Sequence, residues 1–127
     1  MKLRIKGNSL RLRIARSEVA RLLVGGCLEE TIYFAPEANA SFSYSLQAAD
    51  SINAPTVQYT ESGLAVLIPV DRANTWGMTD EVGIAANINL GRFGSLSLLI
   101  EKDFACLDQS DEDNQDTFPN PNAGPSC

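Results

Sequence analysis

The chain has 127 residues, 44% of them hydrophobic and 20% charged, a composition typical of one globular domain. It contains no histidine, which excludes every Ser-His or Cys-His catalytic pair and every histidine-bound metal. The formal net charge of −6 conceals an uneven distribution. Seven of the ten Lys and Arg residues lie in the first 21 positions, and seven of the sixteen acids lie from residue 101 onward.

The first residues are not a secretory signal, because charged and apolar residues alternate there without an apolar core. The sequence contains no stretch of 18 consecutive apolar residues, so no membrane-spanning helix is predicted. The three cysteines, Cys27, Cys106 and Cys127, lack the even number and the CxxC spacing of a disulfide framework or a zinc site. No GxGxxG, GxxxxGK[ST] or GxSxG motif occurs. We therefore expect a cytoplasmic protein with reduced cysteines, no cofactor and no membrane association.

Residues 2–6 and 9–14 are predicted to form a β-hairpin. In both segments apolar residues alternate with Lys or Arg. Gly7-Asn8 suits the two-residue turn between them, because both residues tolerate positive φ. This register pairs Ile5 with Leu10, so that one face of the hairpin is apolar and the other is cationic.

A short helix follows, with Ser17 as its N-cap and Gly25-Gly26 at its end. A second short helix, DRANTWGM, is capped by Asp71, and Trp76 on it is expected in the core. The alternation of apolar residues predicts the remaining strands at 28–35, 41–48, 55–60, 64–70, 82–90 and 95–102.

The second half of the chain repeats the plan of the first half at an offset of 54 residues. Leu10 falls on Leu64, and Leu22 falls on Trp76. Residues 1–104 are therefore predicted to be one duplicated domain with ββαββ repeats at 1–48 and 55–102, although convergent hairpin patterning is an alternative explanation. The predicted fold class is a β-dominated α+β domain with two short helices. Its strands form either an antiparallel, barrel-like sheet, which hides strand edges, or a two-layer arrangement.

Residues 105–127 are predicted to be an acidic, proline-containing tail with little structure of its own. Its acids are one candidate to cover the cationic face of the first hairpin, at Arg4, Arg11 and Arg13. Because the tail is tethered, even a weak contact would be populated. Simple solvation of an exposed charged strand face is the alternative explanation.

Glu101, Asp103 and Cys106 form the densest cluster of reactive side chains. Two carboxylates on one strand face can bind a hard cation or act as an acid/base pair, with the thiol as a soft ligand or nucleophile. Alternatively, they mark the solvated end of the last strand, with Phe104 and Cys106 buried.

The segments MKLRIKGNSLRLRIARSEVARLL, EETIYF and EKDFACL, together with the acidic tail rich in Pro and Asn, resemble a family of small bacterial proteins of unknown function. The resemblance spans most of the chain. It implies a small bacterial cytosolic protein and implies no activity.

The lack of catalytic motifs and the segregated charge favour a non-enzymatic binding or accessory protein that meets a partner protein through charged surfaces. The alternative is a small metal-handling protein or enzyme that uses Glu101, Asp103 and Cys106. A third hypothesis is anion binding by the hairpin under control of the tail. Nucleic acid is disfavoured, because no aromatic residue interleaves the hairpin cations. The sequence does not define an oligomeric state.

Overall fold

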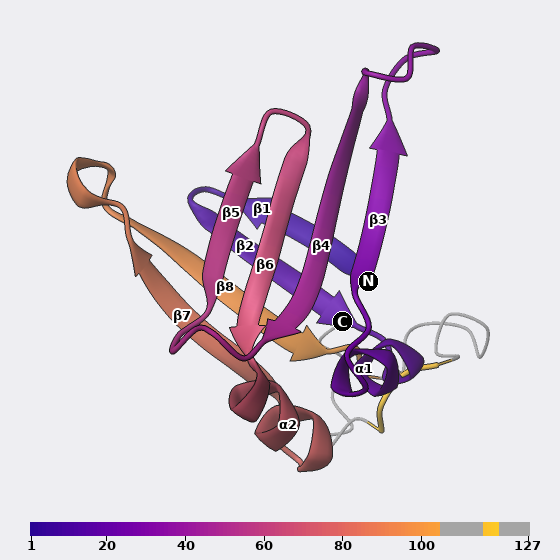
Figure 1. The fold of residues 1–127 in the computed structure, drawn as a ribbon, viewed down its shortest axis with the longest axis vertical. Coiled ribbons are helices and arrows are strands. Elements are labelled where there is room, and N and C mark those ends of the chain that lie inside the picture. Colours follow the sequence, from indigo (N-terminus) through magenta and orange to yellow (C-terminus); the bar gives the residue numbers. More distant parts are fainter. Residues whose placement is uncertain (105–115, 120–127) are drawn as a thin grey trace.

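The computed structural model describes residues 1–104 and 116–119 (Figure 1). The first half contains β1 (Lys2–Lys6), β2 (Ser9–Ile14), α1 (Arg16–Leu23), β3 (Leu28–Tyr33) and β4 (Ser41–Ala49). The second half contains β5 (Thr56–Thr60), β6 (Gly63–Pro69), α2 (Val70–Met78), β7 (Gly83–Asn89), a short 3-10 turn η1 (Gly91–Phe93) and β8 (Ser95–Lys102). The predicted ββαββ order is confirmed in both halves.

The offset of 54 residues holds for the element boundaries. β1 starts at residue 2 and β5 at residue 56, and the starts of β2 and β6, of α1 and α2, and of β4 and β8 also differ by 54. β3 and β7 start at residues 28 and 83, a difference of 55. The repeated hydrophobic pattern therefore corresponds to a repeated structural plan.

The strands form two four-stranded sheets, in the orders β1-β2-β8-β7 and β3-β4-β6-β5. Each sheet combines one hairpin from each half of the chain. The four hairpins are antiparallel as expected, whereas the central pairs β2–β8 and β4–β6 are parallel. Of the two predicted arrangements, the two-layer one is observed, and the described strands do not close into a barrel.

The helices explain this exchange of hairpins. α1 leads from β2 in the first sheet to β3 in the second, and α2 leads from β6 back to β7 in the first. Both helices lie at the same end of the sheets, where the chain crosses between layers (Figure 1). Within the described part of the chain, no helix is long and apolar enough to cross a membrane.

One core joins the two sheets and both helices. Alternate residues of each central strand point into it, and Leu12, Leu46, Val66 and Ile100 are fully buried. Trp76 of α2 is also fully buried, as predicted, and its indole N–H donates a 3.1 Å hydrogen bond to the carbonyl of Val82. A core of this kind fixes which side chains of each strand face outward.

The first hairpin has the predicted register. Ile5 pairs with Leu10 and Leu3 with Leu12, and Gly7 has a positive φ of 55° in the two-residue turn. The cationic side chains of β1 and β2 consequently share the outer face of the first sheet.

The predicted helix caps are wrong at both helices. The N-cap of α1 is Ala15, whose N–H donates a 2.9 Å hydrogen bond to Glu18 Oε1, and Ser17 lies in the first turn. The N-cap of α2 is Pro69, and Asp71 lies in the first turn. Each strand continues into its helix almost without a loop, so each helix begins one residue before the Ser or Asp that was expected to cap it.

Candidate anion-binding face

The outer face of the first sheet carries three rows of side chains that run across its strands. The register places Lys2, Arg13, Glu101 and Gly83 in the first row. It places Arg4, Arg11, Leu99 and Ala85 in the second row, and Lys6, Ser9, Ser97 and Asn87 in the third. Positive charge therefore gathers over β1 and β2, and uncharged side chains lie over β7 and β8 in the second and third rows.

Acids neutralise the first row. Glu101 is only 13% exposed, and its Oε1 lies 2.9 Å from Arg13 Nε and 2.8 Å from Arg11 Nε. The Nε–H group of Arg11 has no hydrogen-bond acceptor among the described residues, but its Nη2 donates a 3.4 Å hydrogen bond to Glu101 Oε2. Lys2 Nζ lies 3.1 Å from Asp103 Oδ2. Glu101 and Asp103 are thus each occupied by cations of the hairpin.

The structure describes two of the three candidate site residues that the sequence grouped together. Glu101 is in β8, Asp103 lies one residue beyond its end, and Cys106 lies outside the described residues. Within residues 1–104 and 116–119, no group of three or more Cys, Asp or Glu side chains could hold a metal ion. The observed chemistry of Glu101 and Asp103 is ion pairing with Arg11, Arg13 and Lys2.

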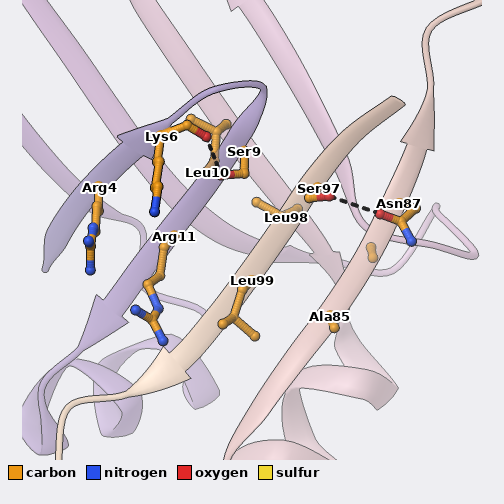
Figure 2. A pocket seen from close by; sticks show the side chains of 11 residues that line it. Arg4, Lys6, Ser9, Leu10, Arg11, Ala85, Asn87, Ser97, Leu98 and Leu99 are labelled. Atoms are coloured by element: carbon orange, nitrogen blue, oxygen red, sulfur yellow. Dashed lines mark hydrogen bonds between the residues drawn. The ribbon is translucent and has the colours of Figure 1, made fainter. Parts of the chain in front are cut away.

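The second and third rows line a depression of about 590 Å³ (Figure 2). Arg4 and Lys6 of β1 and Arg11 of β2 lie on one side of it, and Asn87 of β7 lies on the other (Figure 2). The remaining lining residues are small or apolar: Ser9, Leu10, Ala85, Ala86, Ser97, Leu98 and Leu99. No acid is among the described residues that line the depression.

Arg4 and Lys6 form no ion pair with any described carboxylate. Opposite them, Ser97 Oγ donates a 3.1 Å hydrogen bond to Asn87 Oδ1, as Figure 2 shows. That bond leaves the Asn87 amide nitrogen as a donor on the side of the depression opposite the cations. The depression thus offers positive charge and amide donors, which suit a carboxylate or another anion.

Sequence reasoning found part of this face. It selected Arg4 and Arg11, because cations that alternate with apolar residues must share a strand face. It missed Lys6 and the neutral side of the depression at Ser97 and Asn87. Small polar residues that alternate with apolar ones in 82–90 and 95–102 were the available signal, but it acquires meaning only when β8 is known to lie beside β2.

The described part of the tail contacts α1. The Asp116 carboxylate accepts a 3.0 Å hydrogen bond from the Ser17 N–H and a 2.6 Å hydrogen bond from its hydroxyl, and these bonds lower the pKa of Asp116 below its usual value. The Asp116 carbonyl accepts a third hydrogen bond from the Arg16 N–H. The tail acids at positions 108–113, expected over the hairpin, lie outside the described residues.

These features define a small two-sheet α+β domain with a cationic depression on the outer face of one sheet. The chain belongs to a family of unknown function (DUF7009), which matches residues 1–122. This result agrees with the resemblance to a family of unknown function that the sequence motifs indicated. No curated protein and no solved structure matches the chain.

Proposed function

We propose that this protein is a non-enzymatic binding module that holds an acidic segment of a partner protein on the outer face of the first sheet. The depression beside Arg4, Lys6 and Arg11 carries the proposal, because no acid is among its described lining residues and Arg4 and Lys6 have no described ion pair, whereas Arg11 is paired with Glu101. Arginine recognises carboxylates with a planar fork of donors, which favours an acidic peptide as the ligand.

The shape and composition of the depression support a peptide over a nucleic acid. None of the described residues that line it is aromatic, so these residues offer no platform on which bases stack. The small side chains of Ser9, Ala85 and Ser97 let an extended chain approach the sheet closely. Because Arg4 and Lys6 are exposed, the interaction is screened by salt and is of moderate strength.

A cytoplasmic location is part of this proposal. Cys27 is an exposed, free thiol. Reducing compartments keep such thiols unpaired, whereas secreted proteins mostly pair theirs.

The test measures binding of a fluorescently labelled peptide of ten glutamates at low ionic strength. The double variant Arg4→Gln/Lys6→Gln should bind this peptide about tenfold more weakly, because two charge-assisted contacts are lost. The matched control is Arg21→Gln/Arg92→Gln, which removes two exposed cations elsewhere and also changes the net charge from −6 to −8 (−6 minus 2).

Equal weakening in both double variants would show that only net charge matters, and would overturn the proposed site. Tighter binding of a single-stranded oligonucleotide than of the peptide, at the same ionic strength, would overturn the proposed class of partner.

A further inference from the structure

Lys102 occupies a core position of β8. Strand alternation places its side chain on the same face as Leu98 and Ile100, and in the parallel pair it stands opposite Ile14. Only 5% of Lys102 is exposed. Among the described residues, Lys102 is the only charged residue that is buried. Its neighbours on the inward face of β8, Leu98 and Ile100, are aliphatic.

The ammonium group of Lys102 has little compensation from the described chain. Its Nζ donates a 2.6 Å hydrogen bond to the carbonyl of Thr79 and lies 5.3 Å from the centre of the Phe118 ring. It forms no ion pair with any described carboxylate. Glu81, whose carboxylate lies close enough for Lys102 to help lower its pKa, is already bound by Arg72. A buried charge without a counter-ion is energetically unfavourable, so an external anion that pairs with Lys102 would be stabilised there.

Lys102 lines a cleft of about 610 Å³ beside both helices. The apolar walls come from Val19 and Leu23 of α1, from Met78 of α2, and from Phe104 and Phe118. The volume lies in the range of small-molecule sites, and the apolar walls alternate with the polar or charged residues Arg16, Thr79, Asp80 and Lys102.

The polar residues of the cleft define the charge of its ligand. Arg16 supplies a second cation besides Lys102, and Asp80 supplies one negative charge. One anionic head therefore meets Lys102, whereas a second negative charge on the ligand would approach Asp80. The cleft does not overlap the depression on the first sheet, since the two share no lining residue.

We propose that this cleft binds a small monocarboxylate with an apolar body, whose carboxylate pairs with Lys102 Nζ while its chain lies against Val19, Leu23 and Phe118. The carboxylate supplies the counter-ion that Lys102 lacks among the described residues, and the two further N–H groups of Lys102 donate hydrogen bonds to it. The site is separate from the proposed peptide-binding face and does not depend on it.

Sodium octanoate is the probe, and 1-octanol is its uncharged analogue. Both are titrated into the full chain, and binding is followed by amide chemical shifts of α1 and of residues 78–80. Octanoate should produce saturable shifts. Lys102→Met removes the charge and keeps an unbranched side chain that is one atom shorter. It should weaken octanoate binding about tenfold while leaving octanol binding unaffected.

Two further variants keep the result interpretable. If circular dichroism shows that Lys102→Met does not fold, Arg16→Gln on the exposed rim should still weaken octanoate selectively, by about threefold. Arg4→Gln/Lys6→Gln should leave octanoate binding unchanged, so that failure of the peptide site and failure of this one are distinguishable. Absence of saturable octanoate binding, or equal loss of octanoate and octanol in Lys102→Met, would overturn the proposal.

Discussion

Arg13 and Glu101 face each other across the parallel pair β2–β8, and Arg13 Nε donates a 2.9 Å hydrogen bond to Glu101 Oε1. Arg11 Nε lies 2.8 Å from the same oxygen, so one largely buried carboxylate serves two guanidinium groups. The pairing joins the two ends of the sequence, which carry its opposite charges. It also determines where the outer face of the first sheet is neutral and where it stays cationic.

Replacing Glu101 with glutamine should therefore have two opposite effects. The free energy of unfolding should fall by about 1–2 kcal/mol, because two partly buried arginines lose their counter-ion. Affinity for the ten-glutamate peptide should rise severalfold, because Arg11 is released toward the depression. Urea unfolding and peptide titration measure the two effects. Glu61→Gln, in an exposed turn, is the control with the same change in net charge, and equal peptide affinity in the two variants would contradict the prediction.

The contact between Asp116 and Ser17 should make the stability depend on pH. Hydrogen bonds from Ser17 lower the pKa of Asp116 in the folded state, so the ionised form stabilises the fold. This contribution is present above the unfolded pKa of about 3.9 and is lost as the pH falls through the lower folded value.

Asp116→Ala should accordingly cost about 1 kcal/mol at pH 7, the usual cost of a lost contact at the first turn of a helix. The difference from the wild type should shrink as the pH falls through the lowered pKa of Asp116. A pH-independent remainder is expected, because alanine is strained at the positive φ of 60° found at position 116. Asp71→Ala, in the first turn of α2, is the matched control and should cost less at pH 7. A cost for Asp116→Ala that is the same at pH 7 and at pH 3 would show that its charge plays no part.

The positions of the strands could be predicted from the sequence because alternation is a local property. Leu10 and Leu12 alternate with arginines, so the strand, its buried face and its turn follow from a few adjacent residues. The pairing of β2 with β8 could not be predicted in this way. Ser9 and Ser97 are 88 positions apart in the sequence (97 minus 9), and both strands alternate, so no local pattern states that they are neighbours or that they run parallel.

The two candidate sites also differ in whether their residues could be predicted from the sequence. Arg4 and Arg11 were identifiable because outward cations on one hairpin are visible in the sequence. Lys102 was not, since a lysine at the end of a strand is typical of a solvated position. Only the register of β8, which continues the inward series of Leu98 and Ile100, places its side chain inside. Buried charges are therefore found from the structure and not from the pattern.

Trp76 should be one of the most important single side chains for stability. It is fully buried, and its indole N–H is bonded to the carbonyl of Val82. Trp76→Leu, which copies the Leu22 found at the equivalent position of the first half, should lower the free energy of unfolding by about 3 kcal/mol. It leaves a cavity and removes one of two hydrogen bonds to the Val82 carbonyl, which keeps the bond from the Lys102 N–H. Trp76→Phe keeps an aromatic ring and should cost less. Chemical denaturation gives both values, and a cost below 1 kcal/mol for Trp76→Leu would show that Leu22 and Trp76 are interchangeable.

The close approach of α1 and α2 depends on Gly77. A Cβ atom at Gly77 would lie 2.8 Å from both Leu23 Cδ1 and Leu23 Cδ2, closer than packed atoms tolerate. In an isolated helix, Gly→Ala is favourable by up to about 1 kcal/mol, but here the Leu23 side chain must move and lose its packing. We therefore expect Gly77→Ala to be neutral or destabilising in the wild-type chain.

The same substitution should stabilise a chain that already carries Leu23→Ala, because the clashing methyl groups are then gone. A double-mutant cycle of Gly77→Ala and Leu23→Ala, measured by urea unfolding, should give a coupling energy of about 1 kcal/mol. Additive effects of the two substitutions would mean that the Leu23 side chain can move away from a Cβ atom at position 77 without loss of stability. The helices would then tolerate a side chain at position 77, and their close approach would have to depend on other residues of the core.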